Sequence, residues 1–393
     1  MASLYLGRTA TSYTSEPAAG STTDGLYVNG GTAAISGQLN VCTNGGSNSS
    51  DSVRIDSGAL TVGSTTTVTL NNGSRWSVLD INGGTFTSND ATGAGIQLGG
   101  VFAGENAVML VRSGTAFADT ITFGDVNQTS GADVLNVTGG ILYIGSGGMV
   151  QGGTGPYTST ISLTGTGTLG ALANWSSALN IILGGDTIKA ADVSGTGHNI
   201  TLSGTLTGTT LTKTGSGTLV IAGPSSYTGA TTVSAGILEI TGTVSSTSSV
   251  SIASGASLYL AGGSLSVSGG VTNGGTFKIS GTPTIALAGS FINNGVLDLI
   301  NGSSSLPPNF VNNGTVLNAG NVKLQQFSMT GTSLNLTIQS YVEHTYQLQR
   351  ASSLTNPNWT NVGSAQAGTG SSLEFTDPGA TGAQGFYQIV VSP

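Results

Sequence analysis

The chain has 393 residues, of which 64 are glycine, 7 % are charged and 37 % are hydrophobic. Seventeen acidic residues outnumber nine basic ones, and no basic cluster could neutralise a phosphate backbone. We therefore expect no nucleic acid and no anionic lipid among the partners, and we predict no membrane insertion, because no apolar run approaches the roughly 18 residues of a spanning helix.

Residues 1–20 contain one candidate strand, SLYLG at residues 3–7. This segment lacks the basic start and the roughly 7–15-residue apolar core of a secretory signal. We expect residues 1–20 to cap one end of the fold or to act as an assembly strand that pairs with a neighbouring molecule.

Residues 21–120 are predicted to contain short strands separated by turns rich in glycine, serine and asparagine. The spacing between these strands is about 21 to 26 residues, which predicts coils with long corner loops. The candidate strands are GQLNV, GALTV, GGTFTS and AVMLVRS.

From residue 121 one apolar position recurs along the chain with a period of about 19–20 residues. Such a period is typical of a β-solenoid, in which each coil is too small to bury its own apolar side chains and stacks on the next. We predict a solenoid over residues 21–320, with about fifteen coils and a length of ~70 Å at the usual interstrand spacing. The eleven positions are Ile121, Ile141, Ile161, Ile181, Ile200, Leu219, Leu238, Leu258, Phe277, Leu297 and Val316.

Three segments near the end of this region resemble one another: VTNGGTFKI, FINNGVLDL and FVNNGTVLN. Their first asparagines, Asn273, Asn293 and Asn312, follow the same period as the apolar positions. We expect these side chains to stack at one corner and to hydrogen-bond along the rod.

Residues 322–393 differ in pattern from the rest. LNLTIQ, HTYQLQRAS, WTNVGS, SLEFTDP and GFYQIVVSP read as alternating strands separated by turns, and aromatic residues concentrate here. This pattern predicts a small C-terminal β-sandwich, whose compact core needs bulky side chains.

Residues 213–240, KTGSGTLVIAGPSSYTGATTVSAGILEI, resemble the autotransporter-associated β-strand repeat of bacterial passenger domains. The resemblance covers about thirty residues and implies a right-handed β-helix, surface-exposed and often adhesive or structural, with no catalytic residue to carry over. The C-terminal block resembles the small sandwich modules that end some large bacterial repeat proteins.

Candidate chemistry is sparse. The best carboxylate cluster is Asp119, Asp125 and Asp133, with Arg112 nearby. We interpret these as carboxylates of corner loops; the alternatives are a calcium site or a cryptic polysaccharide-cleaving site. The two histidines, His198 and His344, are expected in different domains, and the single cysteine, Cys42, excludes a CxxC motif. We predict no catalytic, cofactor-binding or metal-binding residue.

Two spans of about fifty residues carry at most one charge, so long faces of the rod are expected to be uncharged. Uncharged strand edges favour pairing with other molecules. The sequence therefore favours a secreted, non-enzymatic structural protein that self-associates into an extracellular fibre or surface layer. The alternative is a surface adhesin or carbohydrate-binding rod that contacts glycans through its sandwich, with Trp359 as a candidate contact. Ice binding is a third alternative, but the regular Thr-x-Thr ladder that it needs is not visible.

Overall fold

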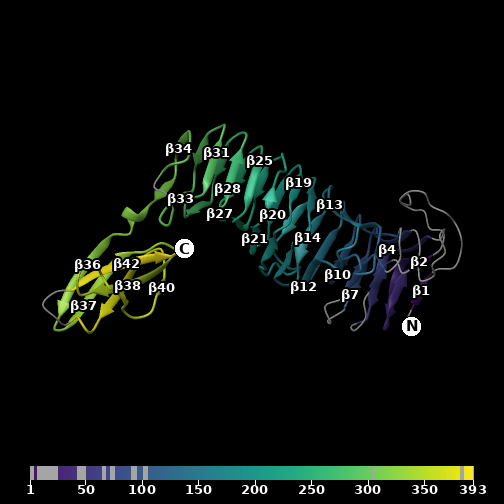
Figure 1. The fold of residues 1–393 in the computed structure, drawn as a ribbon, viewed down its shortest axis with the longest axis horizontal. Helices are drawn as coiled ribbons and strands as arrows, with labels where there is room; N and C mark the ends of the chain where they lie inside the picture. Colours follow the sequence, from purple (N-terminus) through teal and green to yellow (C-terminus); the bar gives the residue numbers. More distant parts are fainter. Residues whose placement is uncertain are drawn as a thin grey trace.

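A computed structural model describes residues 4–6, 25–41, 50–63, 68–70, 76–89, 95–100, 105–302, 305–380 and 385–392. Parallel strands from β1 (Leu4–Leu6) to β35 (Thr315–Leu317) stack into a long, gently curved solenoid (Figure 1). Antiparallel strands from β36 (Leu324–Thr330) to β42 (Phe386–Ser392) form a C-terminal module beside the last coils. The prediction of an all-β solenoid followed by a small antiparallel β-module is confirmed.

Each coil of the solenoid has three short strands, one on each of three faces. Most strands pair in parallel with their equivalents in the coils before and after, so each face is a ladder of strands. On face 1 the strands from β15 onward form a sheet of their own, next to β12. Face 1 contains β1, β3 (Leu39–Val41), β5 (Val68–Leu70), β8 (Ile96–Leu98), the ends of β10 (Thr115–Phe123) and β12 (Ile141–Gln151), β15 (Trp175–Ser177), β18 (Ile200–Leu202), β21 (Thr218–Ile221), β24 (Gly236–Ile240), β27 (Ala256–Ala261), β30 (Thr276–Ser280), β33 (Val296–Asp298) and β35.

Faces 2 and 3 complete the coil, and glycine-rich corners connect them. Face 2 contains the first parts of β2 (Gly25–Ile35) and β4 (Ser50–Val62), then β6 (Trp76–Ile81), β9 (Glu105–Val111), β11 (Gly131–Val137), β13 (Thr158–Leu163), β16 (Ile181–Leu183), β19 (Leu206–Gly208), β22 (Pro224–Ser225), β25 (Thr243–Thr247), β28 (Ser264–Val267) and β31 (Thr284–Leu287). Face 3 contains the second parts of β2 and β4, β7 (Thr85–Ser88), the starts of β10 and β12, β14 (Thr168–Ala171), β17 (Thr187–Lys189), β20 (Leu211–Thr214), β23 (Thr231–Val233), β26 (Val250–Ile252), β29 (Val271–Asn273), β32 (Phe291–Asn293) and β34 (Phe310–Asn312).

The predicted apolar ladder is confirmed from Ile200 to Val316. Seven of the eleven positions pair with one another along face 1, and all but Val316 are buried. Burying one Leu or Ile side chain stabilises the fold by about 1.5–3 kcal/mol. This repeated burial, rather than any single coil, holds the rod together.

The first four predicted positions do not lie in that ladder. Ile121 lies on face 1, but it pairs with Met149 and not with Ile141. Ile141 lies on face 3, and Ile161 pairs with Ile181 on face 2. The reason is coil length: in the earlier coils, paired positions of face 1 are further apart in the sequence than the predicted period, because the corner loops there are longer. The assumed constant period of 19–20 residues therefore placed successive predicted positions on different faces.

The C-terminal module has two antiparallel sheets. One contains β36, β37 (Ser333–Gln339) and β41 (Ser372–Asp377); the other contains β38 (Thr345–Ala351), β39 (Thr360–Asn361), β40 (Gln366–Ala367) and β42. Alternation places one side of each strand in a core between the sheets, as β37 shows with every second residue buried. The core residues are Leu334, Leu336, Ile338, Tyr346, Leu348, Leu373 and Phe375.

The module follows the one-turn 3₁₀ helix η1 (Ala319–Asn321), packs on the outer surface of face 1 and reaches past the last coil (Figure 1). The contacts join β30, β33 and the residues after β33 to the module: Lys278 bonds to Glu343, Asp298 to His344, and Asn301 to Val391. In the part of the chain that the structure describes, no helix is both long and apolar enough to cross a membrane.

Candidate functional site

The predicted carboxylate cluster does not converge. Asp119 on β10 accepts a hydrogen bond from the backbone N–H of Ser146 at 3.0 Å, and Asp125 stabilises its own turn by accepting from the N–H of Asn127 at 2.8 Å. Asp133 on β11 is buried and accepts from the Gln128 side chain. These are structural roles at three separate places.

Arg112, which lies near the same carboxylates in the sequence, pairs with Asp80 at 3.0 Å instead. Within the described ranges, no group of three or more His, Cys, Asp or Glu residues could hold a metal ion. Cys42 and most of residues 1–20 lie outside the described residues. Trp359, the candidate glycan contact, is half-buried rather than fully exposed to solvent. The three predicted carboxylates therefore form no pair on one face.

The two histidines pair with different carboxylates. His198 Nε2 lies 3.7 Å from Asp192, and both side chains are partly exposed. His344 Nε2 lies 2.6 Å from Asp298 Oδ2, and both side chains are buried where the module meets face 1. The first contact is a surface pair, whereas the second is part of the junction between the two parts of the fold.

A buried lysine occupies an inward position on face 3. Lys213 pairs in register with Ile188 and Val233, yet its side chain is fully enclosed. Its Nζ donates to the carbonyls of Thr214, Gly215 and Ala235 at 2.9, 2.7 and 2.8 Å. An ammonium has three N–H donors, so these three carbonyls satisfy the group completely.

Burial lowers the pKa of Lys213 to about 8 from its ordinary value of 10.5. Between these two values the unfolded chain binds a proton that the folded chain does not bind. We therefore expect the free energy of unfolding to rise with pH from about 8 to 10.5, by at most about 1.4 kcal/mol per pH unit. Chemical denaturation of the wild type and Lys213→Met across this range measures the effect. The difference between the two proteins should grow with pH, and a constant difference would contradict the assignment.

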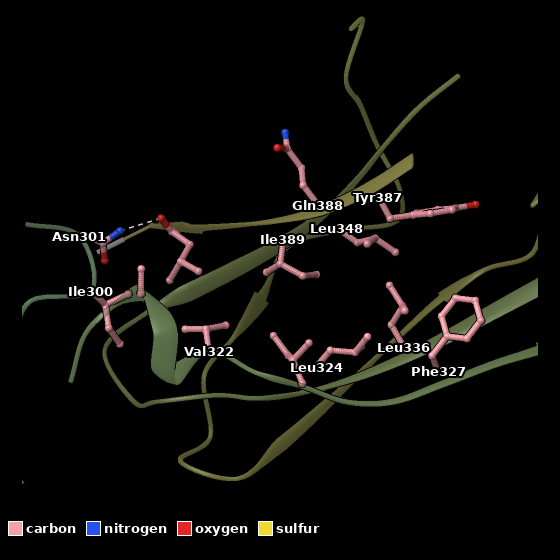
Figure 2. A pocket seen from close by; sticks show the side chains of 13 residues that line it. Ile300, Asn301, Val322, Leu324, Phe327, Leu336, Leu348, Tyr387, Gln388 and Ile389 are labelled. Carbon is pink, nitrogen blue, oxygen red and sulfur yellow. Dashed lines mark hydrogen bonds between the residues drawn. The ribbon is translucent and has the colours of Figure 1, made fainter. Parts of the chain in front are cut away.

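A hollow with an apolar lining lies in the C-terminal module and has a volume of about 610 Å³. It runs between β36 on one side and β42 on the other, and the residues after β33 close one end (Figure 2). No ionisable side chain other than the phenol of Tyr387 lines it. The lining residues are Ile300, Asn301, Ala319, Val322, Leu324, Phe327, Leu336, Ile338, Leu348, Tyr387, Gln388, Ile389 and Val391.

Sequence reasoning missed both Lys213 and this groove. The sequence did contain a signal for the burial of Lys213. Alternate residues of a strand point inward, and Lys213 lies two residues after the inward residue Leu211. The groove depends on which strands pair with which, and the alternation of apolar residues within one strand does not reveal this.

Comparison with known protein families supports the repeat. Residues 211–240 match the model of the passenger-associated-transport-repeat. No curated protein and no solved structure matches the chain. The conspicuous residues of this stretch have structural roles: Lys213 bonds to corner carbonyls, Tyr227 is buried with its hydroxyl 2.8 Å from that of Thr231, and Gly236 has φ +64 and no room for a Cβ beside Lys213 Nζ.

The chain thus carries a passenger-associated-transport-repeat, and its repeating parallel strands are consistent with a passenger β-helix. Such repeats imply a secreted or cell-surface protein, and repeat solenoids of this kind are typically structural.

Proposed function

We propose that the protein is a secreted, non-enzymatic structural subunit whose solenoids join end to end into an extracellular fibre or surface layer. The observation that carries this proposal is the open edge of the last coil. Among the described strands, β31, β34 and β35 pair only with the coil before them. In Figure 1 the module lies below β31 and β34, and its β36–β37 end reaches past the last coil.

The side chains of the last coil are correspondingly accessible. Leu306 and Val311 are 51 % and 47 % exposed, and the asparagine ladder ends at Asn312, which is exposed although Asn273 and Asn293 are fully buried. No ionised side chain lies on β31, β34 or β35. Natural proteins usually protect such an edge with a charge or a proline.

The opposite end has the complementary edge. Among the described strands, β1 pairs only with β3, and β2 pairs only with β4. Pairing of the last coil of one molecule with the first coil of the next is a heterologous contact, and a heterologous contact that does not close generates a filament.

Negative-stain electron microscopy at several concentrations tests the proposal. The fourteen strands of face 1 span about 65 Å at the interstrand spacing. We expect fibres with an axial repeat near that length, lengthened by whatever coils lie at the joint. Val311→Lys places a charge at the joint and should abolish the fibres, whereas Ile182→Lys places the same charge on the outer surface of β16 in mid-rod and should not.

Isolated short rods at every concentration would overturn end-to-end assembly. They would favour the alternative of an adhesin or glycan-binding protein that acts as a single rod.

A further inference from the structure

The three-stranded sheet of the module has an inner face that is only partly covered. Directly opposite residues in an antiparallel pair point to the same side of the sheet. Leu324, Phe327 and Met329 on β36 lie opposite Ile338, Leu336 and Leu334 on β37, which are core residues. The three β36 side chains therefore face inward, yet they are 58 %, 62 % and 49 % exposed.

These side chains lie at the side of the module where both sheets end. Within the described part of the chain, β42 pairs only with β38, and no strand follows it on its second side. Tyr387 and Ile389 of β42 line the groove and stay half-buried (Figure 2). The groove is the open side of the module, between β42 of one sheet and β36 of the other (Figure 2).

Both edges that border the groove lack the usual protection. β36 and β42 contain no acidic or basic residue and no proline. Edge strands without such devices pair readily with other strands. The two free edges belong to different sheets but lie on the same side of the module.

The backbone pattern identifies which groups of β42 are free. The carbonyl of Leu348 accepts from Val362 at 2.9 Å, so the backbone groups of Leu348 point away from β42. Ile389 lies opposite Leu348, and in an antiparallel pair its backbone groups then point to the free edge, as do those of Tyr387 and Val391. Asn301 already donates to the Val391 carbonyl at 2.7 Å.

We propose that a second copy of this chain completes the module, with the two β42 strands antiparallel about a two-fold axis at Gln388. In this register Tyr387 of each copy pairs with Ile389 of the other, and the Asn301 contact is kept. The open sides of the two modules then face each other across the axis, so the second copy encloses Leu324 and Phe327 and the two β36 edges meet.

The sequence of β42 suits a strand that the second copy adds at this groove. A strand that completes the module needs apolar residues inward at alternate positions and uncharged polar residues outward. Tyr387 and Ile389 meet the first requirement. Gln388 meets the second, because it already donates to Gln349 at 2.8 Å on the outer surface, and a second Gln388 beside it continues that row of amides.

This contact is separate from the end-to-end joint. A two-fold interface is closed, so it makes dimers whether or not fibres form. Failure of fibre formation therefore leaves the inference intact, and its own failure leaves the proposed function intact.

Light scattering coupled to gel filtration tests the dimer in the Val311→Lys background, where fibres should not interfere. We expect a dimer mass. Phe327→Glu should give a monomer without unfolding the module, because Phe327 is exposed in the single chain. Leu354→Glu changes an equally exposed apolar residue that does not line the groove and should leave the dimer intact. A monomeric parent protein, or a dimer that survives Phe327→Glu, would overturn the inference.

Disulfide trapping tests the register. Opposed residues of a non-hydrogen-bonded antiparallel pair have Cα atoms about 4.5 Å apart, which a disulfide can span. With Cys42 replaced by serine, Gln388→Cys should oxidise to a covalent dimer. Gln347→Cys, one strand further from the axis in each copy, should stay uncrosslinked. The reverse pattern would exclude this pairing of β42.

Discussion

Replacement of Asp298 with alanine is expected to weaken the docking of the C-terminal module by about 1–3 kcal/mol, the usual cost of leaving a buried polar group without its hydrogen-bond partner. Asp298 Oδ2 lies 2.6 Å from His344 Nε2, and Oδ1 accepts from the N–H of Ile300 at 3.0 Å. The two side chains are 5 % and 0 % exposed, so water cannot replace the missing carboxylate.

The neighbouring side chain of Lys278 makes this position more sensitive. Lys278 donates to the carbonyl of Glu343 at 2.6 Å and lies over the ring of Tyr259. Burial lowers the pKa of Lys278, and the charge of Asp298 opposes that shift. Without Asp298, the junction keeps a buried lysine and a buried histidine and loses the anion between them.

Hydrogen exchange of the module against that of the solenoid measures the effect. Exchange should accelerate in β38 and in the residues after β33, while the mid-rod coils stay protected. Asp192→Ala is the matched control, because it removes the carboxylate from the partly exposed His198 pair and should leave the exchange of the module unchanged. Equal effects of the two substitutions would show that the Asp298 contact does not hold the junction.

Much of the solenoid could be predicted because its chemistry is local and periodic. From Ile200 onward the coils keep a nearly constant length, so one inward position predicts the next. Before Ile200 the prediction assigned residues to the wrong face. Longer corner loops there increase the number of residues per coil, although the strands themselves are unchanged. The spacing of apolar residues in the sequence does not distinguish a coil with a longer loop from an apolar residue on the neighbouring face.

The junction and the groove could not be predicted for a different reason. Asp298 and His344 lie far apart in the chain, in sequences of unrelated pattern, and they meet only because the module packs on face 1. The exposure of Phe327 likewise depends on β42 being the last strand of its sheet. Both features arise from tertiary arrangement, which strand alternation leaves undetermined.

The asparagine ladder was predicted as a row of hydrogen-bonded amides, and the structure confirms this prediction. It also shows that two of the three amides are buried. Asn273 Nδ2 donates to Asn293 Oδ1 at 2.8 Å, and Asn293 Nδ2 donates to Asn312 Oδ1 at 2.8 Å and to the carbonyl of Thr315 at 3.0 Å. Asn273 and Asn293 are fully buried at the inward end of their strands, not on an exposed corner. The middle amide therefore needs both an acceptor and a donor.

Asn293→Asp changes one side-chain group and is expected to cost about 3–5 kcal/mol of unfolding free energy, the range for an unpaired buried charge. The carboxylate still accepts from Asn273, but it faces the oxygens of Asn312 and Thr315, to which Asn293 donated. Asn312→Asp is the control, because the ladder uses Asn312 Oδ1 only as an acceptor and the side chain is exposed. A carboxylate there should change the free energy of unfolding by less than about 1 kcal/mol.

Thermal and denaturant unfolding of both variants measure these two effects. The loss in Asn293→Asp should shrink as the pH falls and the new carboxyl becomes protonated, since a neutral carboxyl can donate to Thr315 or Asn312 again. A loss that does not change with pH would show that shape, rather than the donor at Asn293, is what the last coils require.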